Sequence, residues 1–146
     1  HATFYVSKHA IPLIKLKGGA IMNLSSTAGL YGYPMRSPYA SAKWAIVGLS
    51  KTMAMELGPF NVRVNCICPG SVNGARMDRV ISSIAKATGE SVEKVRQDNV
   101  QNTSMTTFVD AEDIANMIVF SFSDLGAKIS GQSLTVDGDT HSLATY

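Results

Sequence analysis

Three residues in the first third of the chain have the types and the spacing of a proton-transfer site. Ser26, Tyr39 and Lys43 form an S-x12-Y-x3-K pattern in this 146-residue sequence. Tyr39 directly follows Ser37-Pro38, in which the serine hydroxyl can cap a helix and the proline suits a first helical position. Residues four apart on a helix share one face, so the lysine ammonium is predicted to lie beside the phenol.

A phenol beside a fixed positive charge can act as both acid and base near neutral pH. A free phenol titrates near ~10, and bringing it towards neutrality requires about 3 to 4 kcal/mol. One positive charge about 4 to 5 Å away at an intermediate dielectric supplies roughly that amount. Ser26 follows the apolar run 20–24 and can donate a hydrogen bond to the oxygen whose charge changes. The pattern predicts proton transfer on an alcohol or a ketone.

A bare Y-x3-K would more simply be a helix aromatic and a solvated lysine, because that pattern is common by chance. The serine thirteen residues upstream, placed after an apolar strand and a Ser-Thr-Ala-Gly turn, favours the catalytic interpretation. Ser26 would otherwise be an ordinary turn residue.

Strands and helices are expected to alternate around these residues. Periodicity predicts helices at residues 2–16, 39–57 and 110–123 and strands at residues 20–25 and 132–136. A further strand is expected before the Pro69-Gly70 turn. Gly58-Pro59 should end the second helix, and Asp110 with Asp113 should begin the last one as a capping box does. The near-continuous apolar strands suit a parallel sheet covered on both faces. With no repeat and no low-complexity linker, we assign residues 1–146 to one domain.

The same residues closely resemble the classical short-chain dehydrogenase/reductase family, and the resemblance continues through residues 61–70, 110–115 and 129–138. It implies an α/β fold, the C-terminal part of a doubly wound Rossmann-type parallel sheet with helices on both faces. It also implies an NAD(P)-dependent oxidoreductase that interconverts a secondary alcohol and a ketone by hydride transfer. In that family pattern Tyr39 is the general acid/base, Ser26 positions the substrate oxygen, and Lys43 binds the nicotinamide ribose.

The turn Pro69-Gly70-Ser71-Val72 follows a predicted strand, at the edge of the sheet where ligands bind in open α/β folds. The resemblance implies that this turn contacts the nicotinamide of NAD or NADP, with the Val72 backbone holding the carboxamide. The family usually has threonine two residues further on, where this chain has Gly74, so that contact is lost or taken over by Asn73. The predicted cofactor contacts are Tyr39, Lys43, Pro69, Gly70 and Val72.

No glycine-rich turn between a strand and a helix occurs in the sequence, since Gly18-Gly19 only leads into a strand. In this family such a turn holds the dinucleotide pyrophosphate. We therefore expect the sequence to correspond to the C-terminal half of the enzyme. Two alternatives stay open: a non-catalytic fragment or interaction module that cannot hold cofactor alone, and an isomerase or dehydratase on the same scaffold.

Composition narrows the choice of partners. The net charge is only +2 and the basic residues are scattered, which argues against nucleic-acid binding. The longest apolar stretches have strand length, so no membrane span is predicted.

Cys66 and Cys68 alternate on a predicted strand and are expected to be reduced core residues, which fits a cytoplasmic location. The three histidines lack metal-site spacing, so no metal is predicted.

The helix predicted at residues 39–57 has two apolar faces. The face expected to meet the sheet comprises Tyr39, Ala42, Ile46, Leu49, Met53 and Leu57. The opposite face comprises Ala40, Trp44, Val47, Gly48 and Met55. Either a flanking helix of the same chain covers this second face, or another subunit does. The resemblance, in which this helix contributes to a four-helix dimer interface, favours a homo-oligomer, a dimer or tetramer.

Residues 75–108 correspond to the segment that covers substrates in the resembled family. Arg76 and Arg79 in this segment could bind an anionic group on the substrate. They are more simply interpreted as solvated helix charges, and the substrate is left open.

Overall fold

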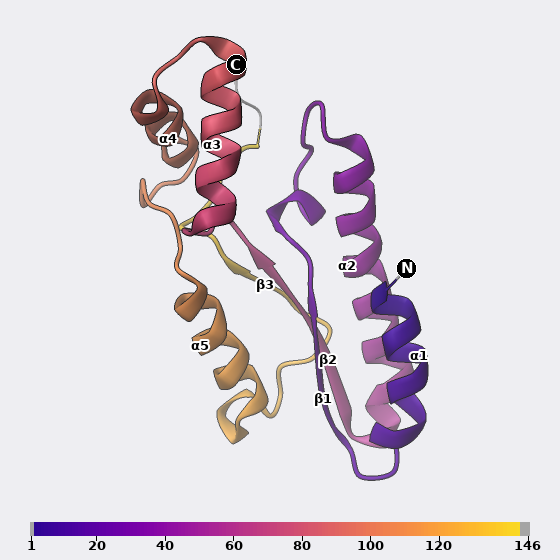
Figure 1. Ribbon diagram of the computed structural model, residues 1–146. Coiled ribbons are helices and arrows are strands. Elements are labelled where there is room, and N and C mark those ends of the chain that lie inside the picture. Colours follow the sequence, from indigo (N-terminus) through magenta and orange to yellow (C-terminus); the bar gives the residue numbers. More distant parts are fainter. Residues whose placement is uncertain (1, 144–146) are drawn as a thin grey trace.

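Three parallel strands form the centre of the protein (Figure 1). The computed structural model describes residues 2–143. Strands β1 (Gly19–Leu24), β2 (Val62–Pro69) and β3 (Ser133–Val136) are hydrogen-bonded in the order β1-β2-β3. The sheet has the parallel pairing predicted from the apolar runs, with Gly19 opposite Val62 and Cys66 opposite Ser133.

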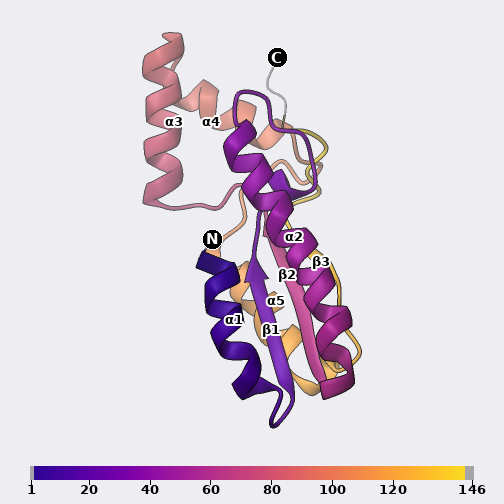
Figure 2. The same cartoon turned by 90° about the vertical axis from the view of Figure 1, so that its right-hand side faces the viewer.

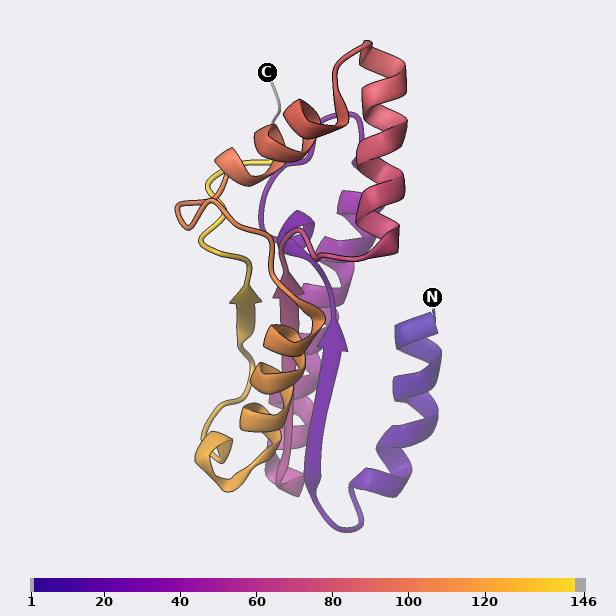
Figure 3. The same ribbon diagram turned by 60° about the vertical axis from the view of Figure 1, so that its left-hand side comes forward.

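Helices cover both faces of this sheet, as the sequence predicted. Helices α1 (Ala2–Ile14) and α2 (Ser37–Leu57) lie on one face, and α5 (Ala111–Phe122) lies on the other (Figures 1 and 2). Helices α3 (Ala75–Thr88) and α4 (Val92–Gln101) extend beyond the carboxyl ends of the strands (Figure 3). Single 3₁₀ turns lie at Thr27–Gly29, Gly58–Phe60 and Asp124–Gly126.

The main core lies between α2 and β2. Met53 and Leu57 of α2 are buried against Val62 and Val64 of β2, as predicted for the sheet-facing side of the helix. A separate small cluster, built on Ile81 with Ala85 and Val95, holds α3 to α4. The α3–α4 pair therefore has its own apolar contacts beside the sheet.

The sequence analysis was wrong about two residues of α2. Val47, which was assigned to the outer face, is 6% exposed and packs with the two cysteines, whereas Ala42 is exposed. The buried stripe runs through Val47, Ser50, Met53 and Leu57 in steps of three and four. Periodicity did not select this stripe because it includes a serine.

Ser50 is buried because its hydroxyl is satisfied on both sides. It donates to the Ile46 carbonyl at 2.7 Å and accepts from the Asn23 amide of β1 at 2.9 Å. A buried hydroxyl with both bonds made carries little desolvation cost. The Asn23–Ser50 bond also fixes α2 to β1 next to the site described below.

Both cysteines are buried, free thiols on β2, as expected. The interaction with the neighbouring Cys66 thiol, and then the burial of Cys68 itself, raise the pKa of Cys68 well above its usual range. Cys68 is therefore a protonated thiol at neutral pH.

The helix ends agree in part with the predictions. Asp110 begins α5 with a capping box, and its backbone N–H donates to Asp113 at 2.8 Å. The predicted Ser37 cap is wrong, because Arg36 precedes the helix and Ser37 is already its first residue. The reason is that the Ala40 N–H donates to the Arg36 carbonyl, which starts the helical pattern one residue earlier. Helix α2 ends at Leu57, before Gly58-Pro59, as predicted.

None of the helices in the described part of the chain has the length and apolar character needed to cross a bilayer.

Strand β1 lies at one edge of the sheet and is hydrogen-bonded to a single strand within residues 2–143. Its last residue, Leu24, is 57% exposed.

Candidate active site

A cavity of about 540 Å³ lies at the carboxyl ends of the strands, where open α/β sheets bind ligands. It brings together four of the predicted site residues from two distant segments. Lys43 and Pro69 are not part of its wall. The lining consists of Ser26, Thr27, Tyr33, Arg36, Tyr39, Gly70, Ser71, Val72, Asn73, Gly74, Ala75, Arg76, Met77, Val80 and Leu143.

Ser26 lies directly beyond β1 and begins the 3₁₀ turn at Thr27–Gly29. Its hydroxyl oxygen accepts a hydrogen bond from the Ala28 N–H at 3.2 Å. A hydroxyl has one proton to give and can accept at the same time. Within residues 2–143 the Ser26 hydroxyl donates no hydrogen bond, and its side chain lines the cavity. Its predicted role towards a substrate oxygen stays a prediction.

Tyr39 stands in the first turn of α2 and lines the same cavity. Its ring packs edge-on against Tyr33, with 6.4 Å between ring centres. Among residues 2–143 its hydroxyl makes no hydrogen bond, which leaves the phenol available to a bound oxygen.

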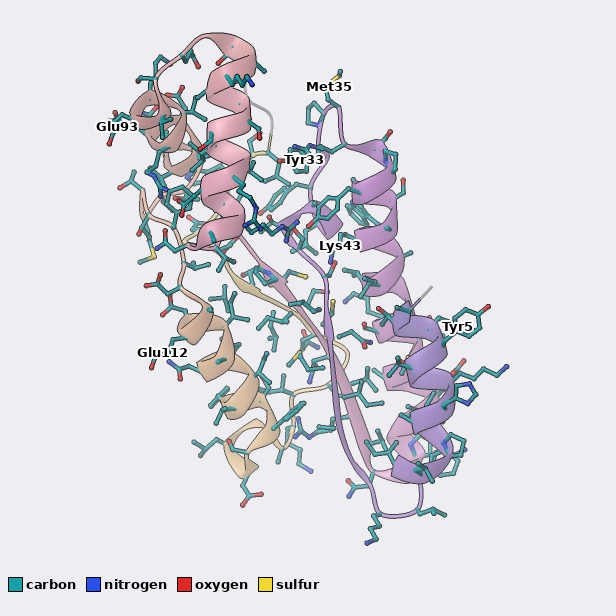
Figure 4. The ribbon with its side chains drawn as sticks, in the orientation of Figure 1. Tyr5, Tyr33, Met35, Lys43, Glu93 and Glu112 are labelled. Atoms are coloured by element: carbon teal, nitrogen blue, oxygen red, sulfur yellow. The ribbon has the colours of Figure 1, made fainter. Side chains whose placement is uncertain are left out.

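Lys43 lies one turn further along α2, on the side facing the end of β1 (Figure 4). Its ammonium nitrogen is 5.6 Å from the centre of the Tyr39 ring and donates to the Leu24 carbonyl at 3.3 Å. The i, i+4 spacing thus places the charge beside the tyrosine, as predicted. The lysine lies beside the cavity rather than in its wall.

A close contact fixes the serine turn against α2. The Ser25 hydroxyl donates to the Lys43 carbonyl at 2.9 Å. Gly29 approaches the same carbonyl so closely that an added Cβ would lie 2.9 Å from its oxygen. Only glycine allows this approach. The distance between the turn that carries Ser26 and the part of α2 that carries Lys43 is therefore set by close packing against the α2 backbone.

The turn after β2 is equally tight. The Gly70 N–H donates to the Val136 carbonyl at 3.1 Å, and a Cβ on Gly70 would lie 2.8 Å from that of Asp137. A side chain at this position would clash with Asp137, which directly follows β3, so only glycine fits here. The sequence did not reveal this contact. Val72 follows in the cavity wall and pairs with Val109.

Asn73 and Gly74 stand where the resembled pattern would place a threonine contact. The Asn73 amide donates to the Asp110 carboxylate at 2.8 Å, at the start of α5. Gly74 has φ +133°, a conformation that other residues rarely adopt. Asn73 is therefore engaged in holding the turn.

The wall residues that sequence reasoning missed include Tyr33 and Arg36. Both lie in the loop between the serine turn and α2. Their position shortly before Tyr39 was the available indication, but no periodicity predicts which loop side chains turn inward.

Fold and site together define an α/β protein of the Rossmann class. The family model described as enoyl-(acyl carrier protein) reductase matches residues 1–141. The chain belongs to the short-chain dehydrogenase/reductase family, which confirms the resemblance.

Relatives and solved structures agree with this assignment. The chain is 36% identical to trans-4-hydroxycyclohexanecarboxylate dehydrogenase of Sinomonas cyclohexanicum over 135 residues, 92% of this chain and 46% of that protein. L-sorbose reductase of Gluconobacter frateurii, solved with NADPH and L-sorbose, superimposes with a TM-score of 0.87 at 26% identity, over 99% of this chain and 55% of that one. 4-Hydroxyisoleucine dehydrogenase, solved with NADH and succinate, superimposes with a TM-score of 0.74 at 32% identity, over 94% of this chain and 53% of that one. The chain thus spans about half the length of these proteins.

Proposed function

We propose that the protein containing this chain is an NAD(P)-dependent oxidoreductase that interconverts a secondary alcohol and a ketone. The observation that carries the proposal is the meeting of Ser26 and Tyr39 in one cavity with the Gly70–Val72 turn. Both hydroxyls can donate there, and Lys43 supplies a positive charge next to the phenol. Relatives named as dehydrogenases, and solved neighbours holding NADH or NADPH, support this choice.

The residues present suit the nicotinamide end of the cofactor. The Gly70–Val72 turn lines the same cavity as Tyr39. When bound, the nicotinamide supplies or accepts the hydride at the carbonyl carbon. Val72 would hold its carboxamide and Lys43 its ribose.

The protein's own part is proton transfer and orientation. In the reducing direction Tyr39 gives its hydroxyl proton to the carbonyl oxygen, while Ser26 donates a hydrogen bond to the same oxygen. In the oxidising direction Tyr39 takes that proton back. Two donors on one oxygen stabilise the charge that develops on it and fix the carbon opposite the cofactor.

The test is a panel of secondary alcohols and ketones supplied with NAD or NADP, with turnover followed as NAD(P)H absorbance and products identified. Oxidation or reduction in step with cofactor conversion is expected. A rearranged or dehydrated product without net change in cofactor would instead identify an isomerase or dehydratase and overturn the proposal.

Replacing Lys43 by alanine should weaken cofactor binding and turnover together, because the ammonium is assigned to the ribose and to the phenol. A hydrogen bond to a charged group contributes about 1.5 to 3 kcal/mol, or roughly 10 to 100-fold in affinity. Fluorescence titration with NAD(P)H measures the first effect. Lys51→Ala, which removes a lysine two turns along the same helix, is the control. Unchanged affinity in Lys43→Ala would contradict the ribose contact.

We infer that the outer face of α2 joins two copies of the protein. Trp44 is 50% exposed and Met55 82% exposed, and no atom lies within 4 Å of a Cβ built on Gly48. Val47 is buried, but nothing within residues 2–143 fully covers the part of this face formed by Trp44 and Met55. An apolar stripe with a glycine suits close helix packing against a second copy.

Trp44→Glu should therefore disrupt assembly without disturbing the site, since a buried unpaired charge opposes association. Light scattering should show a smaller particle. Val92→Glu on α4, where the valine is 46% exposed, introduces the same charge at a similarly exposed apolar position and should not change the particle size. The same oligomer for Trp44→Glu and the unaltered protein would rule out this interface.

A further inference from the structure

The described wall of the candidate active site contains positively charged side chains and no acidic one. Two of the side chains that line it are charged, and both are arginines, Arg36 and Arg76. No aspartate or glutamate belongs to the described lining. Arg36 directly precedes α2 and Arg76 lies in the first turn of α3, so the charges come from separate segments that meet at the cavity.

Within residues 2–143, neither arginine forms an ion pair with an acidic side chain. The ion pairs in the described part of the chain join Lys94 to Glu90 and Asp98, and Arg96 to Asp78. Asp78 is the acidic residue closest in sequence to Arg76, but its carboxylate is paired with Arg96 of α4. Arg36 has an aromatic neighbour instead, with its guanidinium 6.0 Å from the centre of the Tyr33 ring.

The start of α3 adds to the positive potential. Gly74 precedes this 14-residue helix and offers no side chain to cap it. The first N–H groups of a helix lack partners within the helix and carry its positive partial charge. Residues 74–77, which include these groups, lie in the cavity wall beside the Arg76 side chain.

The remaining wall suits a carbon skeleton. Met77, Val80 and Leu143 contribute apolar surface, and the ring of Tyr33 contributes an aromatic one. The volume of about 540 Å³ lies within the usual range for small-molecule sites. The two hydroxyls and the two arginines therefore belong to the wall of one cavity of small-molecule size.

We propose that this cavity binds a substrate that carries an anionic group, a carboxylate or a phosphate, and that Arg36 and Arg76 hold that group. The inference rests on the proposed oxidoreductase function, since the reacting carbon must lie at Ser26 and Tyr39. Guanidinium groups match the paired oxygens of carboxylate and phosphate. Arg79, which the sequence paired with Arg76, does not line the cavity and has no part in this site.

Two pairs of probes separate the anion from the rest of the substrate. One pair is 3-hydroxybutyrate and its methyl ester, and the other is glycerol 3-phosphate and glycerol. Turnover of each is measured in the full enzyme with saturating NAD or NADP. The unaltered enzyme should prefer the charged member of at least one pair, and the pair that shows this preference distinguishes carboxylate from phosphate.

Arg36→Gln and Arg76→Gln should each lower kcat/KM for the preferred charged member about tenfold or more while changing the uncharged member little. Arg79→Gln is the matched control on the same helix. It should leave unchanged the ratio of kcat/KM for the charged member to kcat/KM for the uncharged member. An equal loss for both members, an equal loss in the control, or no preference in the unaltered enzyme would overturn the proposal. A fall in cofactor affinity with an unchanged ratio would also overturn it, because the arginines would then serve the cofactor.

Direct binding keeps the inference testable if none of the four compounds turns over. Calorimetry with butyrate and with inorganic phosphate should show binding that weakens about tenfold in Arg76→Gln and persists in Tyr39→Phe. That result without turnover would reject the oxidoreductase and retain the anion site. Binding of neither anion, or equal binding in Arg76→Gln, would reject the anion site whatever the turnover shows.

Discussion

Tyr39→Phe is expected to remove most of the turnover of the full enzyme, by about 10² to 10⁴-fold, because it deletes the proton that the reaction transfers. The fold should persist, since phenylalanine keeps the ring that packs edge-on against Tyr33. The hydroxyl makes no hydrogen bond within residues 2–143, so its loss leaves no partner unsatisfied there. Steady-state rates with a saturating alcohol, and circular dichroism of the same sample, measure the two effects.

Tyr31→Phe is the matched control, because Tyr31 lies in the same loop region but not in the cavity wall. Its turnover should stay close to that of the unaltered enzyme. Cofactor affinity in Tyr39→Phe should fall less than turnover, since the aromatic ring remains in place. Retention of full turnover by Tyr39→Phe would remove this residue from the chemistry.

The parts of the site that the sequence predicted are those fixed by short-range geometry. The i, i+4 step from Tyr39 to Lys43 places both side chains on one face of a helix, and in the structure the ammonium lies 5.6 Å from the centre of the ring. Ser26 could be placed because a parallel strand must end at the ligand-binding edge. Their roles in catalysis remain predictions, and so does the assignment of residues 1–146 to one domain.

Long-range contacts account for what the sequence did not reveal. Val47 was placed on the wrong side of α2 because both sides of that helix are apolar, and the buried side is identified by the Asn23–Ser50 hydrogen bond between residues 27 apart. Gly70 meets Asp137 across the sheet, a contact that no local pattern encodes. Arg36 reaches the cavity from a loop, where neither a helical nor a strand period applies.

The 146 residues produced alone are expected to bind NAD(P) at least about 10²-fold more weakly than a longer polypeptide that also carries a glycine-rich strand-turn-helix. The contacts proposed for the nicotinamide are present at Tyr39, Lys43 and Val72, but no such turn for the pyrophosphate occurs in the sequence. Each lost hydrogen bond to a charged group costs about 1.5 to 3 kcal/mol, so two are enough for this difference.

The comparison requires a folded, monomeric chain. Strand β1 has an open edge within residues 2–143, and an open edge tends to recruit another strand. Light scattering should therefore set the working concentration, and circular dichroism should confirm the helices before calorimetric titration with NADH and NADPH. Micromolar affinity in that monomer would show that Tyr39, Lys43 and the Gly70–Val72 turn hold the dinucleotide without a pyrophosphate site, and the division of the cofactor contacts proposed above would be wrong.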